Sequence, residues 1–281
     1  MINKSQEHKI KELLIRNNSI YANLEINNTL EHFVKRYIKP LQSSVDIKKA
    51  NAIDCGCGYG WFSFAYILSG GKHITMVEPD VNRLAIVKDI ASILEIATDS
   101  VSFINSSIEN LNYNENTFDI FVSIETLEHI GKSSIKKSLK KINFLTSNII
   151  LLTTPNKFFP IIAHDTRIPF LHWFPIKYRK LVTRFVKKNS EHNDFLSPFD
   201  ISIFKNKFKC ITTCLSFRSY NDYIDQFPVY LPYGTNNKLR YLIQPGIFKK
   251  VYYYVISRLC GTNSYYFMPS LSSIFKSIKV D

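Results

Sequence analysis

The stretch IDCGCGYG at residues 53–60, followed by MVEPD at residues 76–80, decides the fold of this chain. It predicts a buried strand that ends in an acidic residue, a glycine loop, a helix, and a second strand that also ends in an acid. Gly56, Gly58 and Gly60 lack Cβ atoms, so the loop can adopt positive φ and let a ligand approach bare backbone. The stretch therefore predicts a ligand site at the carboxyl end of the first strand.

A glycine loop between a strand and a helix is also typical of dinucleotide sites. Those sites have the spacing G-x-G-x-x-G, in which the third glycine lets helix and strand pack closely and the helix N-terminus faces a pyrophosphate. Here the spacing is G-x-G-x-G, and bulky Trp61 stands where the third glycine would be. A pyrophosphate site is therefore not expected, although the loop backbone stays accessible to another ligand.

Two acidic residues narrow the choice of ligand. Glu78 follows the loop at about the distance at which an acid after the second strand binds a ribose diol. Asp54 and Glu78 together would attract a cation and repel a pyrophosphate. A nucleoside with cationic groups and no phosphate fits this pattern, and S-adenosylmethionine is the common one.

With these residues the chain resembles the class I S-adenosylmethionine-dependent methyltransferases. Residues 54–60 match the first motif of that family, D-x-G-x-G-x-G, and the acid of VEPD at residues 77–80 matches its second. The resemblance implies an α/β fold, Rossmann-like and doubly wound, with a mostly parallel seven-stranded sheet and S-adenosylmethionine as cofactor. In this part of the chain it implies the donor-binding residues Asp54, Gly56, Gly58, Tyr59, Gly60, Glu78 and Pro79.

The segment after the third expected strand extends the resemblance. FINSSIENL at residues 103–111 matches the segment that meets adenine in the family. This implies adenine contacts from Ser107 and Ile108. Many relatives carry an aspartate where Ser107 stands, and a neutral hydroxyl is the weaker acceptor of a hydrogen bond.

The fourth expected strand carries a further motif. FDIFVSIETLEHI at residues 118–130 is close to the strand-four signature of the family, so that the resemblance covers about residues 51–217. It implies that backbone carbonyls near Ser123 and Ile124 hold the methionine ammonium. For Leu127, Glu128 and His129, a helix-capping turn is favoured over a catalytic role for His129.

Strand and helix patterns alternate along the chain, which predicts a parallel sheet with ligands at the carboxyl ends of its strands. The expected strands are residues 52–54, 73–77, 101–104, 118–124, 148–153 and 208–217, with a last strand at either 252–256 or 265–268. The expected helices are one or two within residues 13–41, then residues 61–68, 80–97 and 133–145, and one that starts near residues 197–200. The expected parts are an N-terminal helical segment at residues 1–45, a core at 46–217 with a cap inserted at 155–196, and a C-terminal extension at 218–281.

The segment after the fifth strand, residues 154–175, is dense in proline, aromatic residues and histidine. It resembles the T-P-N-x-x-F-P-I…H…P-F-x-H-W-x-P segment of bacterial methyltransferases associated with surface-polysaccharide and related glycan synthesis. An oxygen acceptor benefits from a base within hydrogen-bond reach, and an imidazole titrates near neutral pH. The catalytic candidates are therefore His164, Asp165 and His172, with packing of the cap as the alternative for both histidines.

Composition fits one substantial core. The chain of 281 residues is 45% hydrophobic, and its N-terminus lacks the apolar region of a secretory signal. No apolar run reaches the roughly 18 residues that a spanning helix needs. The five cysteines do not suggest a disulfide scaffold, and small residues in tight positions are favoured over a four-thiolate zinc site. We therefore expect a cytoplasmic protein without a metal.

The formal net charge of +13 indicates either solvated helix faces or attraction to an anionic acceptor. Such an acceptor would be a nucleotide sugar, a glycan diphosphate lipid, an acidic membrane or RNA. The expected reaction is methyl transfer to an oxygen of a small or glycan/glycolipid acceptor. RNA methylation is the alternative, although no separate nucleic-acid module is visible and residues 123–125 lack the Pro-Pro aromatic turn of adenine and exocyclic-amine methyltransferases.

Two further readings stay open. The aromatic runs at residues 251–259 and 265–268, flanked by lysines, suit peripheral contact with the inner membrane face, with core or dimer packing favoured. A catalytically silent partner subunit with the methyltransferase fold is the other reading. The undamaged glycine loop and ribose acid argue against it.

Overall fold

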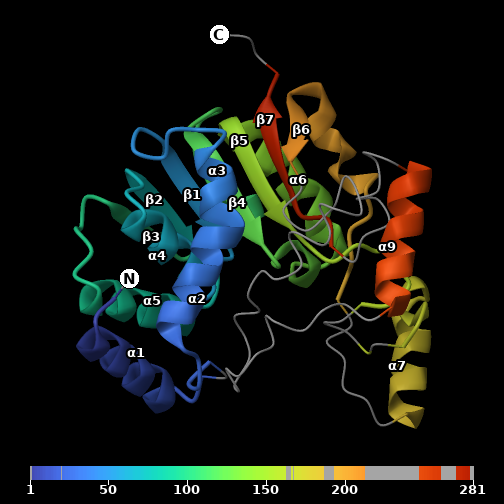
Figure 1. Ribbon diagram of the computed structural model, residues 1–281, viewed down its shortest axis with the longest axis horizontal. Helices are drawn as coiled ribbons and strands as arrows, with labels where there is room; N and C mark the ends of the chain where they lie inside the picture. The colour runs from blue at the N-terminus through green and yellow to red at the C-terminus, as the bar shows by residue number, and fades with distance from the viewer. Residues whose placement is uncertain are drawn as a thin grey trace.

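The computed structural model describes residues 2–19, 21–162, 166, 168–186, 193–212, 247–260 and 270–278. Within them lies one seven-stranded sheet, with the order β3-β2-β1-β4-β5-β7-β6. Its strands are β1 (Asn51–Cys55), β2 (His73–Val77), β3 (Val101–Ile104), β4 (Phe118–Ile124), β5 (Thr146–Thr153), β6 (Phe208–Thr212) and β7 (Ser273–Ser277). The first five strands run parallel, and β7 pairs antiparallel with both β5 and β6. This confirms the predicted mostly parallel, Rossmann-like sheet (Figure 1).

The strand order reverses at β1. From β1 the chain builds the sheet outward through β2 and β3, and then returns to place β4 on the other side of β1. In open α/β sheets, ligands bind at the carboxyl ends of the strands beside such a switch point. The carboxyl ends of β1 and β4 therefore mark the expected site.

Each face of the sheet is covered by its own apolar cluster. Ala52, Met76 and Val122 pack on one face with residues of the N-terminal helices, α4 (Trp61–Leu68) and α5 (Val81–Ile93). Ile53, Val77 and Phe121 pack on the other face with α6 (Lys132–Leu145). In Figure 1, α2 (Ile26–Phe33) and α3 (Lys39–Gln42) lie in front of the sheet and α6 lies behind it. Strands buried on both faces explain the continuous apolar runs in the sequence.

The N-terminal segment forms more helices than the sequence indicated. They are α1 (Lys4–Arg16), α2 (Ile26–Phe33), a π-helical turn (Val34–Ile38) and α3 (Lys39–Gln42). The Asn3 side chain caps α1 by accepting a hydrogen bond from the Gln6 N–H, and the Gln6 side chain accepts one from the Asn3 N–H. This capping box explains why α1 begins nine residues before the expected range of 13–41.

The predicted elements of the central part are confirmed in their positions. α4, β2, β3 and β4 have the expected bounds, whereas β5 begins two residues earlier than expected and α5 ends at Ile93 rather than at residue 97. Short 3-10 turns follow β3 at Ile108–Asn110 and β4 at Leu127–His129, and others precede α7 (Ile176–Phe185) at Leu171–Trp173 and β6 at Asp200–Asn206. The expected turn at Leu127–His129 is therefore confirmed. The helix expected near residues 197–200 is the 3-10 turn at Asp200–Asn206.

Of the two positions predicted for the last strand, 252–256 is wrong and 265–268 is not tested. Residues 252–256 lie in helix α9 (Ile247–Cys260), residues 265–268 lie outside the described residues, and the strand that completes the sheet is β7. The β-branched and aromatic residues of α9 suit a strand by propensity, which tertiary context overrides. Of the expected strand at 208–217, the described part is β6. Within the described residues, no helix combines the length and the apolar character that crossing a bilayer requires.

Candidate functional site

The glycine loop closes the carboxyl end of β1. Gly56, Gly58 and Gly60 have φ values of 72°, 58° and 78°, which residues with a Cβ rarely adopt. The Gly56 N–H donates to the Val77 carbonyl at 2.8 Å, and the Gly60 N–H donates to the Cys57 carbonyl at 2.8 Å. These bonds hold the loop against β2 and fix the path of the backbone into α4.

The three glycines have different surroundings. A Cβ at Gly56 would overlap the Thr126 side chain, and a Cβ at Gly60 would lie 2.8 Å from the Phe64 ring. At Gly58, no atom of the described residues lies within 4 Å of the added Cβ. Gly56 and Gly60 therefore serve close packing within the protein, whereas Gly58 faces the open side of the loop, where a ligand can approach.

Glu78 lies at the end of β2 beside that open side. Its side chain is only 4% exposed. One carboxylate oxygen accepts from the Gly58 N–H at 3.0 Å, and the other accepts from the Asp80 N–H at 3.2 Å and from the Arg83 guanidinium at 3.3 Å. Two backbone N–H groups and the Arg83 guanidinium therefore fix the position of the Glu78 carboxylate, which is the group predicted to bind a ribose diol.

Asp54 at the end of β1 is the second buried acid. It is 3% exposed, and its carboxylate accepts from the Ser63 hydroxyl at 2.7 Å. Burial raises the pKa of Asp54 to about 7, while the Ser63 hydrogen bond lowers it and the nearby Glu78 charge raises it further. A cation next to Asp54 would favour its ionised form. The two acids therefore make this end of the sheet suited to a positively charged ligand.

The segment after β3 is fastened to Glu78. The Asn105 side-chain amide donates to the backbone carbonyls of Glu78 and Pro79, both at 2.9 Å. The Ser107 hydroxyl accepts from the Asn110 amide at 2.9 Å, and Ile108 is buried. The predicted Pro79, Ser107 and Ile108 are thus brought beside the loop region. Asn105 was missed by sequence reasoning, although it stands in the quoted motif.

The end of β4 contacts the glycine loop through Thr126. Its hydroxyl lies 3.3 Å from the Gly56 carbonyl and 3.1 Å from the Ile124 carbonyl. Ser123 is fully buried, and within the described residues its hydroxyl has no hydrogen-bond partner. The Ile124 and Gly56 carbonyls therefore lie on either side of the Thr126 hydroxyl at the switch point. Thr126 was also missed, because nothing in its residue type signals a contact 70 residues back in the chain.

Two glutamates follow directly. Glu125 has a φ of 50°, a left-handed backbone conformation that is costly for a residue with a Cβ. Glu128 is 2% exposed, and its carboxyl accepts from the Thr154 hydroxyl at 3.0 Å. Burial raises the pKa of Glu128 well above its usual value, and the neighbouring Glu125 raises it further. The two carboxyl groups lie at the carboxyl ends of β4 and β5, where the chain leaves the sheet after Thr154.

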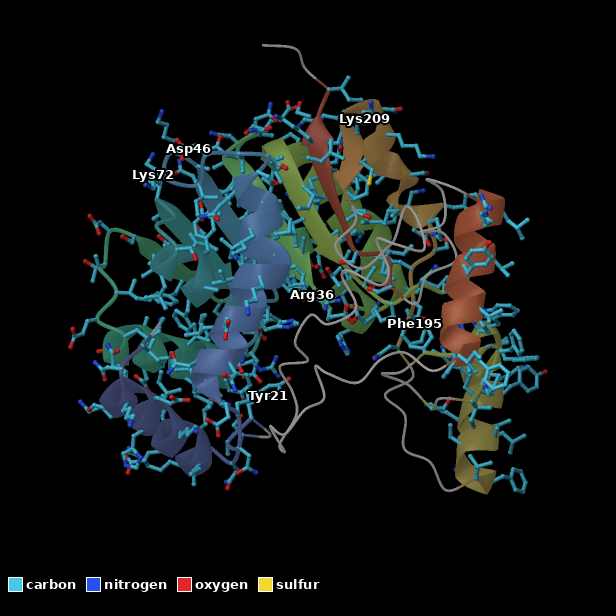
Figure 2. All side chains as sticks on the ribbon, viewed as in Figure 1. Tyr21, Arg36, Asp46, Lys72, Phe195 and Lys209 are labelled. Atoms are coloured by element: carbon cyan, nitrogen blue, oxygen red, sulfur yellow. The ribbon has the colours of Figure 1, made fainter. Side chains whose placement is uncertain are left out.

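An open cavity of about 440 Å³ adjoins the glycine loop at Tyr59. The end of α1 forms one wall and the start of α5 another. The Arg83 guanidinium lies over the Tyr59 ring, 5.9 Å from its centre. The Tyr21 ring meets the Tyr59 ring edge-on, with the ring centres 5.1 Å apart. Figure 2 shows Tyr21 at the foot of the N-terminal helices. The cavity is lined by Arg16, Asn17, Asn18, Tyr59, Asp80, Asn82, Arg83 and Ile86.

This geometry agrees with a family match over the same residues. Residues 52–147 match the model of a family described as a methyltransferase domain, which spans β1 to the start of β5. Residues 52–147 are thus similar to a methyltransferase domain, and we call them the methyltransferase domain after this match. No curated protein matches the chain.

Solved structures that resemble the chain agree on the fold of the methyltransferase domain and its surroundings. The MccD protein has a TM-score of 0.50 and 12% identity, covering 89% of this chain and 96% of that one. A proposed sarcosine dimethylglycine methyltransferase from Galdieria sulphuraria has a TM-score of 0.50 and 13% identity, covering 88% of this chain and 84% of that one. At these identities the likeness is one of fold alone.

The residues of the methyltransferase domain fit S-adenosylmethionine. The open face of Gly58 leaves room for a ligand against bare backbone, and Glu78 offers carboxylate oxygens beside it. The buried Ser123 hydroxyl, without a partner among the described residues, fits a polar group of a ligand at the end of β4. Gly58, Glu78 and Ser123 are therefore compatible with this cofactor, and the other predicted cofactor residues remain predictions.

The predicted catalytic residues lie outside this domain. His172 is buried, its Nε2 lies 2.9 Å from the Lys157 carbonyl, and its ring meets Trp173 and Phe195 edge-on. These contacts favour the packing alternative for His172 over proton transfer. His164 and Asp165 lie outside the described residues, so their predicted role is untested.

Proposed function

We propose that this protein transfers a methyl group from S-adenosylmethionine to an oxygen of a small or glycan/glycolipid acceptor. The placement of two buried acids, Asp54 and Glu78, at the open glycine loop of a methyltransferase domain supports the donor assignment. Such acids stabilise a cationic nucleoside and disfavour a nicotinamide dinucleotide, whose pyrophosphate is anionic.

The donor supplies a methyl group on a positively charged sulfur, which the acceptor oxygen attacks in line. The residues of this chain have three tasks. Glu78 accepts hydrogen bonds from the ribose hydroxyls, and the carbonyls near Ser123 and Ile124 accept from the ammonium. The cap after β5 aligns the acceptor and excludes water, which accounts for most of the rate that a methyltransferase supplies.

An oxygen acceptor must lose a proton, and the chain offers two places for it. His164 in the cap is the base that sequence predicts. The Glu125–Glu128 pair at the end of β4 is the second candidate, because its carboxyl groups lie at the same strand ends as the donor site. A positioned general base contributes about a hundredfold to ten-thousandfold in rate.

The first test is donor binding. Calorimetry should show that S-adenosylmethionine binds and that Glu78→Ala weakens binding by roughly tenfold to a hundredfold, since a hydrogen bond to a charged group contributes about 1.5–3 kcal/mol. Glu115→Ala, an exposed acid away from the loop, is the matched control and should bind normally. Absence of binding to the wild type, or tighter binding of NAD, would refute the donor assignment.

The second test identifies the acceptor. Labelled methyl donor is incubated with the protein and, in parallel, with nucleotide sugars, a lipid extract and total RNA. Label in the sugar or lipid fraction is the expected result. The resemblance of residues 154–175 to glycan-associated enzymes and the missing Pro-Pro turn support this choice over RNA. Strong labelling of RNA alone at physiological salt would reverse it, and no transfer to any class would favour a silent subunit.

The third test assigns the base. With the accepted substrate in hand, His164→Ala should lower the rate by about a hundredfold or more while donor affinity stays nearly unchanged. The pH profile should lose its limb near the histidine pKa. His172→Ala is the matched control from the same cap. A near-normal rate in His164→Ala, together with a large loss in Glu125→Gln, would assign the proton to the glutamate pair.

A further inference from the structure

Helix α7 (Ile176–Phe185) is amphipathic in the reverse sense of an ordinary surface helix. Its buried side chains are Arg179 and Thr183, which stand four residues apart on one face. Its exposed side chains include Leu181 at 51% and Phe185 at 78%. A surface helix normally buries its apolar stripe and exposes its polar one. The outward face of α7 is therefore built to meet something other than water.

The inward face explains how the helix tolerates this arrangement. The Arg179 guanidinium donates to the Asn193 carbonyl at 2.9 Å, and the Thr183 hydroxyl donates to the Arg179 carbonyl at 2.9 Å. The Arg179 contact attaches α7 to Asn193, whereas the Thr183 bond lies within the helix. The exposed apolar residues of α7 are therefore left for another partner. Among its exposed residues are also the bases Lys177, Lys180 and Arg184.

Helix α9 shows the same outward apolar face. Ile247, Val251, Tyr254, Val255 and Leu259 recur at helical spacing, and their exposed fractions run from 43% to 78%. This is the spacing of one helix face. The sequence of α9 contains Lys249, Lys250 and Arg258 and no acidic residue, and the sequence of α7 contains none either.

The two helices belong to one surface. Tyr252 of α9 meets the Phe159 ring edge-on at 5.8 Å. The same segment binds the turn before α7, because the Trp173 indole donates to the Lys157 carbonyl at 2.6 Å. Figure 1 shows α7 and α9 along one side of the molecule, and Figure 2 shows their side chains projecting away from the sheet. We call α7, α9 and the turn Leu171–Trp173 the aromatic–basic face.

Exposed aromatic residues complete this face. Trp173 is 50% exposed and Phe174 is 56% exposed, just before α7. The Lys177 ammonium lies 4.9 Å from the centre of the Tyr178 ring, and the Arg258 guanidinium lies 5.9 Å from that of Tyr254. Aromatic and aliphatic side chains that enter the headgroup region, flanked by bases and free of acids, are the features of a surface that binds anionic lipid.

We propose that the aromatic–basic face docks the protein on the surface of an anionic lipid bilayer. A second copy of the chain would bring bases against bases, since the face carries no acid on either helix, so charge complementarity favours an anionic partner. The apolar side chains would enter the boundary between headgroups and acyl chains, and the lysines and arginines would contact lipid phosphates.

Vesicle sedimentation tests this proposal without any need for methyl transfer. The full chain should sediment with vesicles of phosphatidylcholine mixed with phosphatidylglycerol and remain in solution with phosphatidylcholine alone. Binding should fall steeply in about 1 M salt, where charges are screened beyond roughly 3 Å. Addition of the mixed vesicles should also shift the emission of the exposed Trp173 to shorter wavelength, since the second tryptophan, Trp61, is already buried.

Three double variants locate the face. Leu181→Ser with Phe185→Ser, and Val251→Ser with Leu259→Ser, should each weaken vesicle binding at least about tenfold. Lys177→Glu with Lys180→Glu should weaken it at least about twentyfold, at about fivefold for each base near an anionic surface. The matched control is Leu68→Ser with Phe144→Ser, which are both 43% exposed but lie on α4 and α6, and it should bind like the wild type.

Circular dichroism of each variant shows whether the chain is folded. A folded wild type that does not sediment with anionic vesicles would overturn the proposal. So would equal losses in the control variant. If the serine variants instead turn a dimer into a monomer in sedimentation equilibrium while vesicle binding is unchanged, the face is an interface between copies and the lipid proposal is wrong.

Discussion

At the scale of single residues, the donor site depends on two acids that the fold places out of water. Asp54 and Glu78 end neighbouring parallel strands, β1 and β2, so their charges meet at one edge of the sheet. Glu78 has three donors from the protein. Asp54 has only the Ser63 hydroxyl as a donor among the described residues. Asp54, which accepts fewer hydrogen bonds than Glu78, is the acid whose pKa is raised by burial to about 7.

The raised pKa of Asp54 predicts how donor binding depends on pH. Below about pH 7 the carboxyl group takes up a proton and loses its attraction for a cation. Donor affinity should therefore fall as pH falls through 7, by up to about tenfold for each pH unit. Calorimetry between pH 5 and 8 measures how donor affinity changes with pH, and Asp54→Asn should make that dependence weaker. An equally steep slope in Asp54→Asn would assign the dependence to another group.

The same shift has a consequence of opposite sign for folding. Because the pKa of Asp54 is raised above its ordinary value of 3.8, the folded chain holds this proton more tightly than the unfolded chain. Asp54 therefore weakens the fold progressively as pH rises from about 4 to 7. Asp54→Asn should raise the melting temperature relative to the wild type more at pH 8 than at pH 4. That comparison holds in the absence of any donor.

Gly58 allows the sharpest test of the loop. Its φ is positive and the space around it is open, so Gly58→Ala should fold with a cost of about 1 kcal/mol but obstruct the ligand side. Donor affinity should drop at least about tenfold. Gly70→Ala is the matched control, because Gly70 also has positive φ and lies at the far end of α4. If both variants lose affinity alike, backbone strain rather than access to the loop is responsible.

At the scale of elements, the N-terminal helices extend the methyltransferase domain. The Gln6 amide of α1 donates to the Ile93 carbonyl at the end of α5 at 3.3 Å, and Glu7 accepts from the Ile26 N–H at the start of α2 at 2.9 Å. The end of α1 then forms a wall of the cavity beside Tyr59. The stability of α1 should therefore affect both folding and the donor site.

The cap of α1 makes this testable. Asn3→Ala removes the side-chain oxygen that accepts from the Gln6 N–H and keeps the backbone N–H that donates to the Gln6 side chain. It should lower the free energy of unfolding by about 1 kcal/mol. Denaturant unfolding monitored by circular dichroism measures it. Lys4→Ala, an exposed change in the first turn of the same helix, is the control and should cost less than about 0.5 kcal/mol. Equal stability of Asn3→Ala and wild type would mean that α1 is not part of the cooperative fold.

The sequence predicted an element well where its apolar residues had a clear period and were buried. β2, β3 and β4 were predicted with the right bounds because they are short apolar runs between turn signals. Residues 252–256 of α9 were one of two positions predicted for the last strand, since the tyrosines and valines there have strand propensity and the outward apolar face of α9 hides the usual amphipathic pattern. β7 was missed because only Ile274 and Phe275 mark it, whereas its place between β5 and β6 comes from pairing across the whole chain.

The candidate site divides in the same way. The resemblance placed Asp54, the glycines and Glu78 at their strand ends correctly, because a motif that follows a parallel strand is positioned by topology alone. Thr126 and Asn105 were missed, since their partners lie 70 and 27 residues away. The His172 contacts with Lys157 and Phe195 also depend on the fold of the cap, which no local pattern encodes.

At the scale of the whole molecule, the donor site and the aromatic–basic face are joined by the segment that follows β5. That segment starts at the carboxyl ends of β4 and β5, pairs with residues 196 and 270, and reaches the surface at Phe158. An acceptor with a lipid anchor could thus be bound at the bilayer surface and reach the methyl donor by way of the cap. The proposed acceptor class and the proposed docking surface are consistent with one another. They are tested by separate experiments, methyl labelling for the acceptor and vesicle sedimentation for the surface.

The position of β7 bears on the order in which the chain can fold. β6 lies at the edge of the sheet and pairs with β7 alone among the described strands, and β7 follows all the other described strands in the chain. During synthesis the five parallel strands can assemble early, while β6 keeps an unsatisfied edge until β7 emerges. Deletion of residues 273–277 would therefore unpair β6 as well, and would leave β5 as an exposed, aggregation-prone edge.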